Sequence, residues 1–143
     1  MAMHDLDEPT AECHCILGLV WDEDLNAPAI TERGAPIRIG PAASLSPQHL
    51  LALTASSCLM TTLLTLAAEA GVSVEGYVSS ARLRETPGGT PEVALAPCVV
   101  VLSHEDRKQI DQLWHQAIER SPTLRLLGAH LHVEPAVLVV PPA

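Results

Sequence analysis

Aromatic residues are scarce in this chain of 143 residues, which has two Trp, one Tyr and no Phe. Proteins that bind single-stranded nucleic acids stack the bases on aromatic side chains, so this class of function is excluded. Basic residues are scarce as well, since eight Lys and Arg stand against 17 Asp and Glu, for a formal net charge of −9. A chain with this charge and no basic run repels nucleic acid phosphates and anionic membrane surfaces. We therefore expect neither nucleic acid nor a membrane as a partner.

Signals for export and for phosphate binding are missing too. The first nine residues are polar and acidic, unlike a signal peptide or a transit sequence. The sequence contains no glycine loop leading into a helix and no Gly-x-Ser-x-Gly elbow of a serine hydrolase. With 48% hydrophobic residues, the chain has enough apolar material for a core without disulfides. We expect a cytoplasmic protein with reduced cysteines, a single domain over residues 1–143, and no cofactor.

One long apolar stretch has to be tested as a membrane span. Residues 50–68 contain no charged residue and approach the length that crosses a bilayer. Six of these residues are Ser or Thr, Glu69 follows at once, and no Lys or Arg lies close enough to anchor the ends. The pattern therefore favours a helix covered by other elements of a soluble protein. A chain of this size has difficulty covering such a helix alone, which favours a dimer.

Hydrophobic periodicity and turn residues predict the order of elements. Ser46 and Pro47 suit a helix start, Gly71 suits its end, and Ser103 and Ser121 suit the starts of two further helices. The strands are rich in β-branched residues and are separated by Gly and Pro turns. The predicted elements are strands 12–21, 29–32 and 36–39, helix 47–70, a hairpin of strands 72–84 and 93–102, helices 103–120 and 121–127, and strand 129–140. The order is βββ-α-ββ-αα-β, an α+β class.

The segment Pro47-Gln-His-Leu-Leu-Ala-Leu-Thr-Ala-Ser-Ser-Cys58 is the most specific part of this pattern. Together with the three preceding strands, the hairpin and the helix break at Ser121-Pro122, it resembles the OsmC/Ohr family of thiol-dependent peroxidases over residues 12–140. The resemblance implies an OsmC-like fold with a long buried central helix, in an intertwined homodimer with its sites at the subunit interface. It also implies reduction of organic hydroperoxides in the oxidative stress response, with a thiol reductant.

The resemblance further implies roles for individual residues. Cys58 matches the peroxidatic cysteine, which attacks the peroxide as a thiolate. Gln48 stands where the family has a Glu, and Ser121 stands at the position of the resolving cysteine. The family's Arg has no match before Arg33, so we take Arg33 and Arg38 as candidates for it.

The altered positions change the chemistry that can be expected. Without a fixed cation, only a few per cent or less of the Cys58 thiol would be ionised near neutral pH. Gln48 brings hydrogen bonds but no charge, so it suits orientation better than activation. His49 is a candidate proton shuttle, or alternatively an interface side chain. Ser121 cannot form a disulfide, so a sulfenic acid at Cys58 would have to be resolved by another thiol. The candidates are Cys98, Cys13, Cys15 or an external thiol.

Two alternatives stay open beside the peroxidase. Cys58 can be a small core residue in a catalytically degenerate OsmC-like protein, which would bind a small apolar ligand at the dimer interface. A zinc site could form if the faces carrying Cys13 and Cys15 and the faces carrying His130 and His132 met, since each pair is two residues apart on a predicted strand. Neither spacing is that of a zinc finger or ribbon, and we expect no metal.

Overall fold

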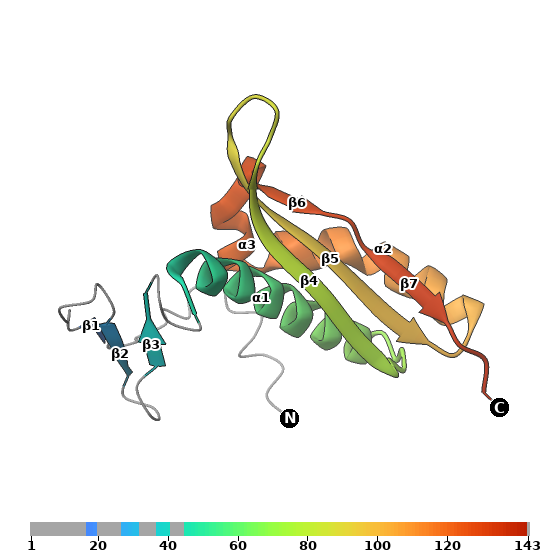
Figure 1. Cartoon of the computed structure of the whole chain (residues 1–143). Helices are drawn as coiled ribbons and strands as arrows, with labels where there is room; N and C mark the ends of the chain where they lie inside the picture. Colours follow the sequence, from blue (N-terminus) through green and yellow to red (C-terminus); the bar gives the residue numbers. More distant parts are fainter. Residues whose placement is uncertain (1–16, 20–26, 32–36, 41–44, 143) are drawn as a thin grey trace. The chain divides into compact units, whose positions relative to one another are not determined.

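A computed structural model describes residues 17–19, 27–31, 37–40 and 45–142 (Figure 1). The chain divides into two compact units, Met1–Pro47 and Gln48–Ala143. The expectation of one domain over residues 1–143 stays a prediction. The first unit contains β1 (Leu17–Leu19), β2 (Ala27–Thr31) and β3 (Ile37–Ile39), which form an antiparallel sheet in the order β1-β2-β3. The three predicted N-terminal strands are confirmed, although residues 12–16 and 20–21 lie outside the described residues.

The long helix α1 spans Pro47–Glu69 and confirms the predicted helix 47–70. It begins at Pro47, whose fixed φ suits the first helical position. The helix ends before Gly71, which has a φ of +72°. Glycine adopts this conformation without strain because it has no Cβ atom. The Val72 amide donates to the carbonyl of Ala67 at 2.9 Å and the Gly71 amide to that of Ala68 at 3.1 Å. These two bonds form a Schellman motif, which satisfies carbonyl groups at the helix end.

Within one chain, α1 is buried along one face. The buried residues on this face are Ala52, Ala55, Leu59, Leu63, Leu66 and Ala67. On other faces Leu53 is 54% exposed and Leu51 is 42% exposed. Among the described residues, α1 is the one helix long and apolar enough to cross a membrane, a property it shares with core helices of soluble proteins. Its buried face packs into the core described below, which is the arrangement of a core helix.

The second unit is built on a mixed sheet. β4 (Gly76–Glu85) and β5 (Pro91–Val101) form an antiparallel hairpin, with Gly76 opposite Val100 and Glu85 opposite Pro91. The strands β6 (Leu131–Val133) and β7 (Ala136–Val139) both run parallel to β5. The predicted single strand 129–140 is therefore two strands. Its start at residue 129 is also wrong, because Gly128–His130 forms a 3-10 turn, and Pro135 interrupts the ladder because it has no amide hydrogen.

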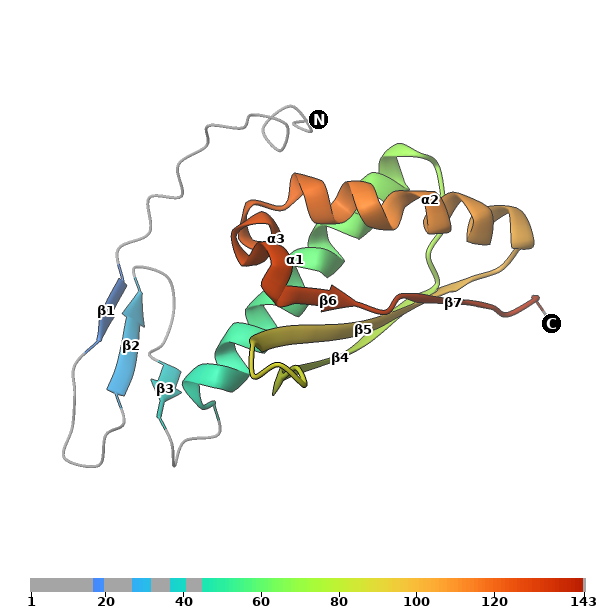
Figure 2. The same cartoon turned by 90° about the horizontal axis from the view of Figure 1, so that it is seen from above.

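The core lies between one face of this sheet and the helices. α2 (His104–Arg120) follows its cap Ser103, and α3 (Pro122–Leu127) follows directly. Figure 2 shows α1 and α2 on the same side of the sheet. The side chains of β5 point alternately to the two faces of the sheet, and those on one face are buried in a cluster with residues of the helices. This cluster includes Val93, Leu95, Val99, Val101, Leu59, Leu63, Ile110, Trp114 and Ala117. The alternate residues of β5 face the outer side of the sheet.

Candidate functional site

Cys58 lies midway along α1. Its side chain is half-buried and packs against the core cluster, and its thiol is free. The Thr62 hydroxyl donates to the Cys58 carbonyl at 2.9 Å, one turn further along the helix. The dipole of a helix acts on groups in its first turn, and Cys58 lies well beyond the first turn of α1. Any activation of the thiol must therefore come from groups outside its own turn of the helix.

The threonine side chains of α1 form hydrogen bonds with the backbone of their own helix. Four threonine hydroxyls donate to the carbonyl four residues earlier, at 2.7 to 3.0 Å: Thr54 to Leu50, Thr61 to Ser57, Thr62 to Cys58 and Thr65 to Thr61. These hydroxyls are satisfied locally, so they can lie in an apolar environment. The helix itself contains no Lys or Arg. A cation that stabilised a Cys58 thiolate would have to come from another element or another chain.

Gln48 and His49 lie in the first turn of α1, and both are exposed. Gln48 precedes Cys58 by ten residues, which corresponds to about 15 Å along the helix axis at 1.5 Å per residue. A Gln side chain does not extend that far. Within one chain, the two residues proposed to act together are therefore held apart by the helix itself.

The candidate arginines and the N-terminal cysteines belong to the first unit. Arg38 is exposed on β3, opposite Pro28 of β2. Arg33, Cys13 and Cys15 lie outside the described residues. A role for any of these four residues at Cys58 stays a prediction.

Cys98 lies on β5, opposite Val78 of β4 and Ala136 of β7. Its thiol is free and half-buried. The neighbouring residues Pro97 and Val99 are fully buried on the core face, so the alternation of the strand places the Cys98 side chain on the outer face. Cys58 packs against the core on the other side of the sheet. Within one chain, the strand therefore separates the two cysteines, and this placement does not suit a disulfide between them.

Ser121 has a structural role at the junction of α2 and α3. It is only 3% exposed, and its hydroxyl accepts a hydrogen bond from the Leu124 amide at 3.4 Å. Its amide donates to the Ala117 carbonyl at 3.3 Å, and its carbonyl accepts from the Arg125 amide at 2.9 Å. Ser121 thus ends one helix and caps the next. This capping accounts physically for a Ser at the position that resembles the family's resolving cysteine.

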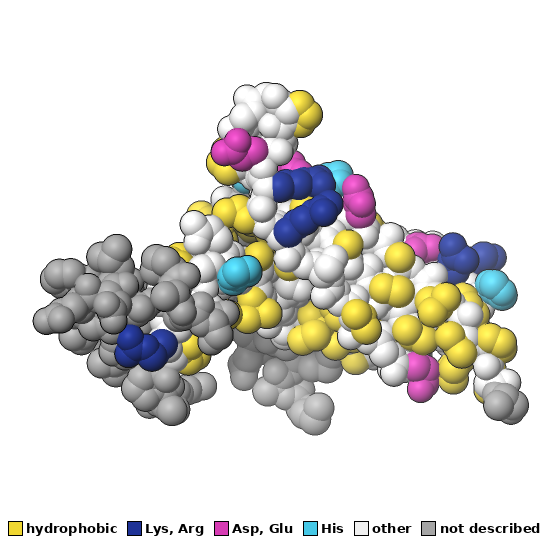
Figure 3. Space-filling model, viewed as in Figure 1, with side chains coloured by type: hydrophobic (Ala, Val, Ile, Leu, Met, Phe, Trp, Pro, Cys, Tyr) yellow, Lys and Arg dark blue, Asp and Glu magenta, His cyan; other side chains and the backbone are white. Residues whose placement is uncertain are grey.

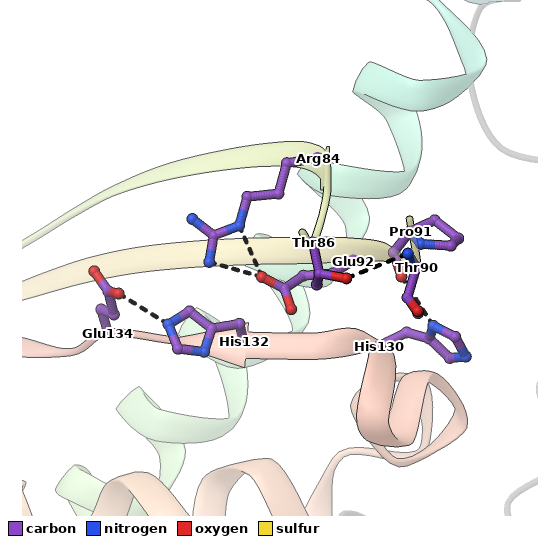
Figure 4. Close-up of polar contacts among 8 residues, drawn as sticks. All are labelled: Arg84, Thr86, Thr90, Pro91, Glu92, His130, His132 and Glu134. Carbon is purple, nitrogen blue, oxygen red and sulfur yellow. Dashed lines mark hydrogen bonds and ion pairs between the residues drawn. The ribbon is translucent and has the colours of Figure 1, made fainter. Parts of the chain in front are cut away.

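The expectation that His130 and His132 share one strand face is wrong. His130 belongs to the 3-10 turn that follows α3, and its Nδ1 donates to the Pro91 carbonyl at 2.9 Å (Figure 4). His132 lies on β6, where its Nε2 donates to Oε1 of Glu134 at 2.9 Å. This hydrogen bond and the nearby imidazole charge hold the pKa of Glu134 below its usual value. In the described part of the chain, no three His, Cys, Asp or Glu side chains are grouped as metal ligands would be.

Two features of the second unit are not among the predictions made from the sequence. On the outer sheet face, Nε and Nη2 of Arg84 both lie 2.7 Å from Oε1 of Glu92 (Figure 4). The sequence signal for this pair is the turn at residues 86–90, because the turn sets the register that brings Arg84 opposite Glu92. In the core, the Tyr77 hydroxyl and the Trp114 Nε1 are buried without a hydrogen-bond partner among the described residues. Burial raises the pKa of Tyr77 to about 12.

Comparisons with known proteins agree with this architecture. The family described as OsmC-like protein matches residues 40–136. An OsmC-like protein from Mycoplasma pneumoniae has a TM-score of 0.71 at 14% identity, over 89% of this chain and 99% of that one. One from Vibrio cholerae has a TM-score of 0.69 at 19% identity, over 85% and 97%. The organic hydroperoxide resistance protein OhrB of Bacillus subtilis has a TM-score of 0.61 at 15% identity, over 86% and 96%. No curated protein matches the sequence.

Proposed function

We propose that this chain, which belongs to the OsmC-like protein family, is a thiol-dependent peroxidase that reduces organic hydroperoxides with Cys58 as its nucleophile. The observation that carries the proposal is the state of Cys58, a free and half-buried thiol midway along α1. It lies within the region that matches the family. The hydroperoxide substrate is supported by the fold shared with a protein named for organic hydroperoxide resistance.

In the proposed reaction, the Cys58 thiolate attacks the terminal oxygen of the hydroperoxide. A sulfur–oxygen bond forms as the oxygen–oxygen bond breaks, and the departing alkoxide takes a proton to become an alcohol. Cys58 is oxidised to a sulfenic acid, which condenses with an external thiol to a mixed disulfide and water. A second thiol then releases Cys58 and leaves as the oxidised disulfide. An external thiol is favoured because Ser121 has no sulfur and Cys98 faces the outer side of the sheet.

We also propose that the active form is a homodimer with α1 at its interface. Along the face of α1 that is not buried, exposed and partly exposed residues recur at helical spacing, among them Leu50, Leu53, Met60 and Leu64. Such an apolar stripe is stabilised when a second surface covers it. A second copy would also supply what one helix cannot, since Gln48 and Cys58 are about 15 Å apart along α1. Gln48 of one copy would then orient the substrate at Cys58 of the other.

A second candidate function follows from the altered positions. α1 has no basic residue, and Ser121 is engaged as a helix cap. Both observations favour a protein that has lost turnover and binds a small apolar ligand beside α1. In this case Cys58 would be a packing residue, and its replacement by Ser would leave ligand binding intact.

Turnover of cumene hydroperoxide with a dithiol reductant separates the two functions. Wild type, Cys58→Ser and the matched control Cys98→Ser are compared under the same conditions. We expect Cys98→Ser to keep the wild-type rate and Cys58→Ser to fall to the uncatalysed rate. Equal turnover by Cys58→Ser and wild type would overturn the proposed nucleophile. No turnover by wild type above the uncatalysed rate would favour the ligand-binding function.

A further inference from the structure

The outer face of the second unit's sheet carries a hollow of about 120 Å³ that is unrelated to Cys58. Its floor is formed by β5, where Ala94 and Ala96 have side chains too short to fill the space. The register places Arg82 of β4, Ala94 of β5 and His132 of β6 in one row across the three strands. Ser80 lies opposite Ala96 in the neighbouring row. Long polar side chains thus stand on both sides of a low apolar floor.

Two pairs of charged or titratable side chains around this hollow are in direct contact. Arg84 is held by Glu92 at 2.7 Å, and His132 donates to Glu134 at 2.9 Å (Figure 4). Arg82 also lines the hollow, and its charge contributes to holding the pKa of Glu134 below its usual value. Within the part of the chain that the structure describes, Arg82 makes no direct hydrogen bond or close ion pair. Figure 3 shows basic side chains next to histidine and acidic ones near the base of the β4–β5 hairpin. The hydrogen-bond donors of the Arg82 guanidinium are therefore available to an anion from solution.

The size and charge of the hollow restrict the anion. A water molecule takes about 30 Å³ in the liquid, so a hollow of this volume holds about four water-sized groups. The carboxylate of Glu134 lies at its rim, and it repels a doubly charged phosphate more strongly than a singly charged anion. A carboxylate carries a single charge and matches the planar fork of a guanidinium with two parallel hydrogen bonds. Its carbon atoms can rest on the alanine floor.

We propose that this hollow binds the carboxylate group of a small organic acid. The Arg82 guanidinium donates to the carboxylate oxygens, and the Ser80 hydroxyl is placed to donate from the neighbouring row. The short aliphatic part of the acid lies over Ala94 and Ala96. This site is on the opposite side of the sheet from Cys58, so it does not depend on the proposed peroxidase chemistry.

The test is an NMR titration of the full-length protein with sodium propionate at constant ionic strength. Sodium chloride and inorganic phosphate serve as comparison titrations. We expect saturable shifts of the Ala94 and Ala96 amides with propionate, and weaker or no saturation with chloride or phosphate. Arg82→Gln is expected to weaken binding at least about tenfold, because it removes the charge-assisted hydrogen bonds. Arg125→Gln, an equal charge change on α3, is expected to leave binding unchanged.

A second variant separates the shape of the hollow from its charge. Ala96→Leu adds side-chain volume over the floor at an exposed position and keeps every charge, and we expect it to abolish the propionate shifts. The proposal is overturned if propionate shifts do not saturate in wild type, or if Arg82→Gln binds as well as Arg125→Gln. Tighter binding of phosphate than of propionate would overturn the assignment to carboxylates. Full binding by Ala96→Leu would show that the hollow is not the site.

Discussion

Two leucines of α1 distinguish folding of the chain from its association. Leu59 is fully buried in the core cluster, whereas Leu53 is 54% exposed in one chain. Leu59→Ala removes buried methyl groups and leaves a cavity, so we expect it to lower the free energy of unfolding by about 2–5 kcal/mol. Full burial of a Leu side chain contributes about 1.5–3 kcal/mol, and Leu53 has only about half of this to lose in an isolated chain. For a monomer, Leu53→Ala should therefore lower the free energy of unfolding by about 1 kcal/mol.

The proposed homodimer changes the second of these values. If a second copy covers Leu53, its truncation should weaken the dimer by about 1–4 kcal/mol at each of the two equivalent sites, which is the cost at a fully buried site less the share already lost in the monomer. Every 1.4 kcal/mol raises the dissociation constant about tenfold. Light scattering after size exclusion measures the association, and urea unfolding at two protein concentrations measures the stability. We expect Leu59→Ala to lower the urea midpoint at both concentrations and Leu53→Ala to dissociate the dimer. A wild-type monomer, or an unaltered dimer in Leu53→Ala, would refute the role of α1 as the interface.

Three further changes test the core and the helix ends, each by urea unfolding. Tyr77→Phe removes a buried hydroxyl without a described partner, so it should keep or raise stability. Because burial raises the pKa of Tyr77 to about 12, wild type should lose stability between pH 10 and 12 as the unfolded tyrosine ionises first, and the variant should lose less. Ser121→Ala should lower the free energy of unfolding by about 1 kcal/mol, and the matched cap variant Ser103→Ala should lower it by a similar amount. An unchanged free energy of unfolding in Ser121→Ala would contradict the capping role of Ser121. Gly71→Ala should lower the free energy of unfolding by about 1–2 kcal/mol, because the backbone at Gly71 has a positive φ that disfavours alanine. The added methyl group itself has room, since no atom lies within 4 Å of it. Unchanged stability would contradict the positive φ at the end of α1.

Local signals in the sequence predict most of the fold. Pro47 and Gly71 define α1 because they act on the backbone itself, and the caps Ser103 and Ser121 define the two later helices in the same way. The last strand was predicted less well. Its apolar alternation continues past Pro135, whereas the ladder with β5 is interrupted there because proline has no amide hydrogen to donate.

The candidate site is less predictable because it depends on long-range packing. The separation of Gln48 and Cys58 follows from helix geometry alone, so it can be predicted from the sequence. The outer placement of Cys98 requires knowledge of which face of β5 meets the helices, and this depends on Leu59, Ile110 and other residues distant in the sequence. A cation beside Cys58 would have to come from another element, and no local pattern specifies such a contact.

The central claim is that Cys58 is a peroxidatic thiol, and its direct oxidation tests this claim. The intact mass of the chain is followed after addition of one equivalent of cumene hydroperoxide, first without and then with a dithiol. We predict rapid addition of one oxygen atom or formation of a disulfide at Cys58, mapped by peptide digestion and reversed by the dithiol. The Cys98→Ser variant should react at the same rate. A Cys58 that stays reduced after this addition, and after a further excess of hydroperoxide, while the protein remains folded, would contradict the proposed function.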